Sequence, residues 1–75
     1  MRKINEIAAE IGRDWKDISN NAFPYYIAMR SIEKPTDTWL EDDGYMVIRK
    51  FLLYSEKWEG DVARKIKNEL KTMLN

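Results

Sequence analysis

The sequence contains no cysteine and no histidine. Disulfides, thiolate chemistry and the usual zinc sites are therefore excluded. Imidazole acid–base catalysis and the nucleophilic schemes that pair serine or cysteine with histidine are excluded as well. Because a small domain without such staples must be held together by packing alone, the composition fits a reducing compartment, and we expect a cytoplasmic protein.

Glycine is also scarce, and the three glycines are scattered at positions 12, 44 and 60. They form no glycine-rich loop of the kind that cradles phosphate groups. The carboxylates fall on polar loops and helix faces, with no histidine or cysteine to accompany them. We therefore expect no enzyme, no catalytic residues, no bound metal and no cofactor.

Neither sign of charge is in excess, since thirteen basic residues balance thirteen acidic ones. General nucleic-acid binders and membrane-surface binders need a basic excess. Long hydrophobic runs are missing too, because the most apolar stretch, residues 45–54, is far shorter than the roughly 20 residues of a transmembrane helix. Residues 1–6 lack the apolar region of a signal peptide. We expect no signal peptide and no membrane partner.

What the sequence does contain is a chain of 75 residues with three Trp, four Tyr and two Phe. That length gives a single domain over residues 1–75, and the aromatic content argues against disorder. A domain of this size buries only about 60% of its unfolded surface, so its stability is marginal and contacts with a partner matter.

Apolar residues recur at three- and four-residue steps in most of the chain, and no stretch alternates as a strand would. We predict an all-α fold with four helices joined by short loops. The first helix keeps its apolar stripe through Gly12, with a break at Gly12 as the lesser alternative. The second has Pro24 in its first turn, after capping Ser and Asn residues. The predicted helices cover residues 3–17, 21–31, 43–55 and 59–73.

The third predicted helix is apolar on nearly every side, with only Arg49 and Lys50 as a polar gap in residues 45–54. Such a helix is normally covered all round, so we place it at the centre with the other three packed about it. Asp42 or Asp43 is expected to cap its start. The second helix is nearly as apolar, and we expect it to be largely buried, or half-buried with one face reserved for a partner.

An acidic loop, residues 33–43, lies between the second and third predicted helices. Five acids against one lysine give it a net charge of −4, and Trp39 and Leu40, its only apolar element, are expected to pin it to the core. Its acids lack the spacing of an EF-hand loop, so we weigh a metal site well below a solvated capping cluster. A further interpretation is an acidic surface that meets a basic partner, with Asp37 and Glu41 as candidate contacts.

Most aromatic side chains are expected in the core rather than on a ligand-binding platform. One or two tyrosines nevertheless exceed what so small a core can hold, and we choose Tyr25 and Tyr54 as partly exposed contacts of a protein interface. The solvent side of the last predicted helix is a second candidate surface, because its basic residues could contact the phosphates of a nucleic acid. Basic residues on a solvent face are the default for any helix, so we rank this surface lower. Its residues are Arg64, Lys65, Lys67 and Lys71.

Four segments of the chain form a recognisable pattern: residues 7–11 (IAAEI), 14–17 (DWKD), 24–29 (PYYIAM) and 58–70 (WEGDVARKIKNEL). Together they resemble a family of small proteins of unassigned function that are encoded by phages and mobile elements. The chain departs from the family pattern at Tyr26, where leucine is usual, and in its more acidic loop. The resemblance implies a helical fold and a phage or mobile-element origin, and it implies no chemistry.

These observations lead to one main hypothesis and one alternative. The main hypothesis is a small cytoplasmic module that binds another protein, or a second copy of itself as a homodimer, without catalysis. The alternative is an accessory protein that binds nucleic acid through the basic face of its C-terminal helix.

Overall fold

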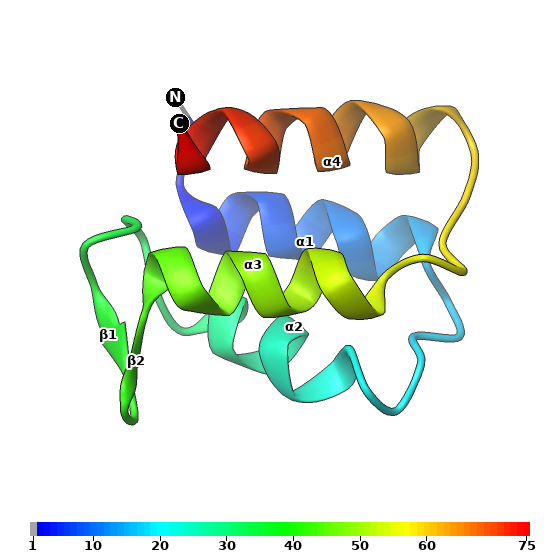
Figure 1. Cartoon of the computed structure of the whole chain (residues 1–75). Helices are drawn as coiled ribbons and strands as arrows, with labels where there is room; N and C mark the ends of the chain where they lie inside the picture. Colours follow the sequence, from blue (N-terminus) through cyan, green and yellow to red (C-terminus); the bar gives the residue numbers. More distant parts are fainter. Residues whose placement is uncertain (1) are drawn as a thin grey trace.

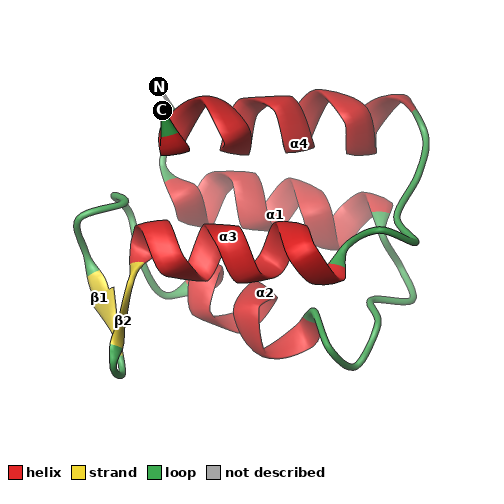
Figure 2. Cartoon of the chain, viewed as in Figure 1, coloured by secondary structure: helices red, strands yellow, loops and turns green. Residues whose placement is uncertain are grey.

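The computed structural model describes residues 2–75 as four helices and one short hairpin (Figures 1 and 2). The four predicted helices are confirmed, although most end earlier or begin later than expected. The prediction of an all-α chain missed two strands of two residues each, which pair antiparallel within the acidic loop. The elements are α1 (Ile4–Asp14), α2 (Phe23–Arg30), β1 (Thr38–Trp39), β2 (Asp42–Asp43), α3 (Gly44–Tyr54) and α4 (Asp61–Leu74).

The four helices enclose one core, with α1 and α3 each packed against α2 and α4. Figure 1 shows α1, α3 and α4 roughly aligned, with the short α2 below α1 and α3. Each long helix turns an apolar stripe inward, because residues three and four apart share a face. The largest buried side chains of these stripes are Ile4, Ile7, Ile11, Val47, Ile48, Phe51, Ile66 and Leu70.

Helix α3 is one of four helices around the core and is not covered on every side, in contrast to the predicted central position. Its buried face carries Val47, Ile48 and Phe51. Met46 and Leu53, on the opposite face, are 38% and 65% exposed. The prediction was wrong because it relied on the number of apolar residues in the helix. An apolar residue stays exposed when no other element packs against its face of the helix.

Helix α1 runs without interruption through Gly12 and ends at Asp14, three residues before the predicted end. Trp15 leaves the helical conformation and is buried in the core. The phenol of Tyr26 in α2 lies directly over Gly12, where a larger side chain would collide with it. The glycine therefore lets α1 and α2 approach closely, which accounts for a residue that costs about 1 kcal/mol of helix propensity relative to alanine.

The helix starts follow the expected capping in part. Helix α2 has Pro24 in its first turn, as predicted, but no side chain caps it; the carbonyl of Ser19 instead accepts hydrogen bonds from the amides of Ala22 and Phe23. At α3 the carboxylate of Asp43 accepts from the amide of Met46 at 3.0 Å, which confirms the predicted acidic cap.

Arg2 ties the start of the described chain to the last helix. Its guanidinium donates to Glu69 in α4 at 2.6 and 3.0 Å and to Glu10 in α1 at 2.7 Å. These hydrogen bonds place the first described residue against α4. No helix within residues 2–75 has the length and apolar character needed to cross a membrane.

Candidate functional site

The acidic loop folds back on itself as a hairpin, and Asp37 organises its base. The Asp37 carboxylate accepts hydrogen bonds from the amides of Glu33 and Lys34 at 2.9 and 3.0 Å, and its carbonyl accepts from Gly44 at 2.8 Å. The hydrogen bonds from Lys34 and Glu33 hold the pKa of Asp37 below its usual value. The structure thus places this predicted interface residue against the backbone of its own loop.

A two-residue turn, Leu40 and Glu41, joins strands in which Trp39 pairs with Asp42. Leu40 has a φ of 56°, the only positive value at a non-glycine position among residues 2–75. Left-handed backbone costs a side-chain-bearing residue about 1–2 kcal/mol, and tight hairpins usually put glycine there. The Leu40 side chain is also 81% exposed. A strained backbone therefore presents a large apolar side chain to solvent.

A groove of about 500 Å³ opens beside this turn, between the start of α2, the hairpin and the middle of α3. We call it the hairpin groove. Its lining is mainly apolar, and the charged groups lie on the hairpin and on α3. The residues that line it are Pro24, Tyr25, Trp39, Leu40, Glu41, Asp42 and Lys50.

Two of the four predicted interface residues, Tyr25 and Glu41, line the hairpin groove, and a third supports it. The Tyr54 ring stacks on the Tyr25 ring, with centroids 5.8 Å apart and planes 15° apart. Tyr25 and Tyr54 are both half-buried, as expected for tyrosines at the edge of a small core. Asp37 is not part of the lining.

Lys50 crosses the groove and contacts both of its walls. Its ammonium donates to the Asp42 carboxylate at 3.0 Å and lies 5.7 Å from the centre of the Tyr25 ring. The hydrogen bond to Asp42 raises the pKa of Lys50, outweighing the opposite effect of burial. Glu41 has no hydrogen-bond or ion-pair partner within the part of the chain that the structure describes. Sequence reasoning did not assign Lys50 to this surface, because its contact with Asp42 exists only once the hairpin has folded.

Other apolar side chains are exposed outside the groove. Phe23 and Ile27 of α2 are 48% and 37% exposed, and they lie four residues apart on one face. Helix α2 is therefore half-buried rather than largely buried. Together with Met46 and Leu53 of α3, these residues give the molecule several apolar surfaces besides the groove.

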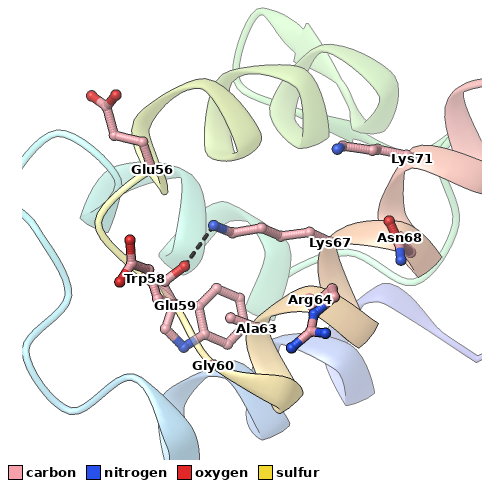
Figure 3. A pocket seen from close by; sticks show the side chains of 9 residues that line it. All are labelled: Glu56, Trp58, Glu59, Gly60, Ala63, Arg64, Lys67, Asn68 and Lys71. Atoms are coloured by element: carbon pink, nitrogen blue, oxygen red, sulfur yellow. Dashed lines mark hydrogen bonds between the residues drawn. The ribbon is translucent and has the colours of Figure 1, made fainter.

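The basic face of α4 is partly occupied by contacts within the chain. Figure 3 shows the Lys67 ammonium donating to the carbonyl of Trp58, at 2.6 Å, in a pocket that also contains Glu56 and Glu59. Burial lowers the pKa of Lys67. Arg64 pairs with Asp61 at 2.8 Å. Two of the four predicted phosphate contacts, Arg64 and Lys67, are therefore bound to groups of the same chain. The other two, Lys65 and Lys71, are exposed and have no such partner within residues 2–75.

The structure and the comparisons add two findings about chemistry and relatives. Over residues 2–75, no group of three or more acidic, histidine or cysteine side chains is arranged to hold a metal ion. Comparison of the chain with protein-family models, with curated proteins and with solved structures gave no significant match.

Proposed function

We propose that this protein is a non-catalytic interaction module that binds another protein through the hairpin groove. The observation that carries the proposal is Leu40, an exposed leucine held in left-handed backbone at the tip of the hairpin. Strained backbone persists where the surrounding structure imposes it, and it concentrates at functional sites. Glycine or asparagine would close the same turn with less strain, so the leucine is better explained by contact with a partner than by folding.

The surroundings of Leu40 support a protein partner rather than a small molecule. The groove is a shallow surface between three elements, and its aromatic walls are Tyr25 and Trp39. Aromatic residues are enriched in the buried centres of protein interfaces, where they supply much of the binding energy. A domain of this size buries only a small hydrophobic core when it folds. Burial of the groove against a partner would therefore add to its stability.

The wider setting of this module is also a proposal. From the resemblance to proteins of phages and mobile elements, we propose that the gene belongs to such an element and that its product acts in the cytoplasm. The partner is then a protein of the same cell or a second copy of this chain. A second copy would also bind through the hairpin groove, and the apolar side chains it would cover there are those of Leu40 and Trp39.

The proposal is tested by affinity capture with matched variants. The wild-type protein, Leu40→Asn and Leu53→Asn are immobilised and exposed to lysate of cells that carry the gene. Asparagine tolerates left-handed backbone, so Leu40→Asn removes the apolar side chain without adding strain. Leu53 is exposed on α3, outside the groove, and is the matched control.

We expect the wild type and Leu53→Asn to retain the same protein and Leu40→Asn to lose it. Retention by the wild type and by both variants would contradict the hairpin groove as the binding surface. A retained complex that dissolves on nuclease treatment would favour the alternative role, in which the basic residues of α4 contact nucleic acid.

A further inference from the structure

We propose that the hairpin groove binds a basic segment of the partner protein, and that Lys50 occupies the place of that segment's arginine or lysine while the groove is empty. This inference rests on the proposed function and adds the chemistry of the partner. The segment has a cationic side chain next to an apolar one. On binding, its cation displaces the Lys50 ammonium from Asp42 and Tyr25.

The contacts of Lys50 show what kind of group the groove holds. One ammonium is placed between a carboxylate, at 3.0 Å from Asp42, and an aromatic face, at 5.7 Å from the centre of the Tyr25 ring. Carboxylates and tyrosine faces both attract cations. Arginine satisfies such a pair better than lysine, because its planar guanidinium stacks on a ring and forms two parallel hydrogen bonds to a carboxylate. The built-in lysine is therefore a weaker version of the expected ligand.

The charge around the groove is complementary to a basic segment. Two acids, Glu41 and Asp42, line the groove, and they belong to a loop, residues 33–43, whose net charge is −4 although the whole chain is neutral. Asp42 is already paired with Lys50, but Glu41, also in the lining, has no partner among the described residues. A segment with two cations can therefore use both carboxylates, which steers it toward the groove and rejects acidic competitors.

The apolar part of the segment would lie against the tip of the hairpin. Leu40, Trp39 and Pro24 form the apolar part of the lining and flank the charged residues. An aliphatic side chain next to the cation would cover the exposed Leu40 side chain and remove it from water. Without such an apolar neighbour, a cation alone gains only the modest energy of an exposed ion pair.

Displacement of Lys50 requires that its own contacts be weak. The Lys50–Asp42 pair lies at the surface, where both side chains remain partly exposed. Pairs of this kind contribute little to stability, so an incoming arginine faces a small penalty. Removing the Lys50 charge should therefore help the ligand. We expect Lys50→Met, which keeps an apolar stem, to tighten binding of a basic peptide by up to roughly fivefold, the upper end for one exposed charge pair.

The experiment begins with a displayed library of short random peptides, selected on the immobilised wild-type protein. Enriched sequences are synthesised with a fluorophore, and their dissociation constants are measured by fluorescence polarisation. The protein panel is the wild type, Lys50→Met, Asp42→Asn, Leu40→Asn and the control Leu53→Asn. Circular dichroism melts of each variant establish that it is folded.

We expect enriched peptides that place arginine or lysine beside an aliphatic residue. Their binding should be tightened by Lys50→Met, weakened by Asp42→Asn and Leu40→Asn, and unchanged by Leu53→Asn. Added salt should weaken it, because the charges are near the surface.

Two other results separate this inference from the proposed function. If acidic or uncharged peptides are enriched and still depend on Leu40, the groove is a protein-binding site but the basic segment is refuted. If binding of a basic peptide is unchanged or weakened by Lys50→Met, the placeholder role of Lys50 is refuted. If no peptide binds, or if binding ignores Leu40, the proposed function falls together with this inference.

Discussion

The indole rings of Trp15 and Trp58 stack with their centroids 5.6 Å apart and their planes only 3° apart. Trp15 follows α1 and Trp58 precedes α4, so the stack joins two connections that are far apart in the sequence. The Phe51 ring in α3 makes a T-shaped contact with each indole, with ring centroids 6.2 and 6.3 Å apart. The Trp58 ring nitrogen also donates to the Asp14 carboxylate at 2.8 Å. One aromatic cluster thus holds three helices together at one end of the molecule.

Replacing Trp58 should therefore be severely destabilising. Trp58→Ala leaves a cavity beside Trp15 and Phe51, and we expect it to lower the free energy of unfolding by about 3–5 kcal/mol. A domain of this length has about 4–11 kcal/mol in total, so this variant should be partly or largely unfolded. Trp58→Phe should lose much less, and Asp14→Ala about 1 kcal/mol, the usual value of one hydrogen bond. Urea denaturation followed by circular dichroism measures all three. An alanine variant as stable as the phenylalanine variant would contradict the role of the stack.

Gly44→Ala tests how closely the hairpin base packs on α3. A β-carbon at Gly44 would lie 2.7 Å from backbone atoms of Pro35, and backbone cannot rotate away as a side chain can. Helix propensity alone would favour alanine by about 1 kcal/mol. We expect the collision to dominate and to reduce stability by about 1–3 kcal/mol, the usual cost of overpacking. Thermal unfolding gives the sign, and a gain in stability would show that the loop around Pro35 lies farther from α3.

Leu40→Gly should change stability and binding in opposite directions. Glycine adopts a φ of 56° without steric cost, so relief of the strain at Leu40 should stabilise the fold by about 0.5–1 kcal/mol. The same change removes the exposed side chain on which partner binding is proposed to depend. Thermal unfolding and affinity capture, performed on the same preparation, test the two effects. A variant that loses stability, or that keeps full binding, would contradict the interpretation of Leu40 as a strained contact residue.

Glu69→Gln should reduce the loss of folding stability that a fall in pH causes. The hydrogen bond from Arg2 holds the pKa of Glu69 below its usual value. A carboxylate whose pKa is lower in the folded state stabilises the fold above its unfolded pKa of about 4.3, and that contribution is lost as the pH falls through the folded value. We expect Glu69→Gln to cost about 1 kcal/mol at neutral pH, as for a partly exposed ion pair. Unfolding curves at neutral pH and in acid should show this difference shrink toward zero below that window. Glu56→Gln, at an exposed residue with no ion pair within residues 2–75, is the control and should show no such change.

The alternative role in nucleic-acid binding has its own test. Lys67 is engaged by the carbonyl of Trp58 and Arg64 by Asp61, which leaves Lys65 and Lys71 as the exposed cations of the proposed contact set. Two exposed lysines on a neutral chain neutralise few phosphates, so we expect no mobility shift of duplex or single-stranded DNA at moderate salt. A shift at low salt that Lys65→Glu combined with Lys71→Glu abolishes would instead support that role.

The helices could be predicted because their signal lies within single stretches of sequence. Ile4, Ile7 and Ile11 repeat with helical spacing, and all three are fully buried. The hairpin could not be predicted in this way, because strands of two residues are too short to show alternation. Its turn gave no signal either, since leucine is among the residues that avoid left-handed backbone.

The candidate site, too, could be predicted from the sequence only in part. Tyr25 and Tyr54 could be chosen from the sequence, because more aromatic surface was present than a small core can hold, and the structure stacks these two rings together. Lys50 could not be chosen, because its importance comes from Asp42, which reaches it only through the fold of the hairpin. Local patterns therefore identified surplus apolar surface, whereas the groove depends on contacts between separate elements.

The salt bridge from Arg2 to Glu69 has a consequence for how the chain can be rearranged. Because it holds Arg2 against α4, a brief linker from the end of α4 could close the backbone into a ring. The ring could then be opened between α3 and Trp58, giving a circular permutant whose first helix is the present last one. Neither the aromatic cluster nor the groove includes the joined ends. A chain with its helices in this new order should therefore form the same groove.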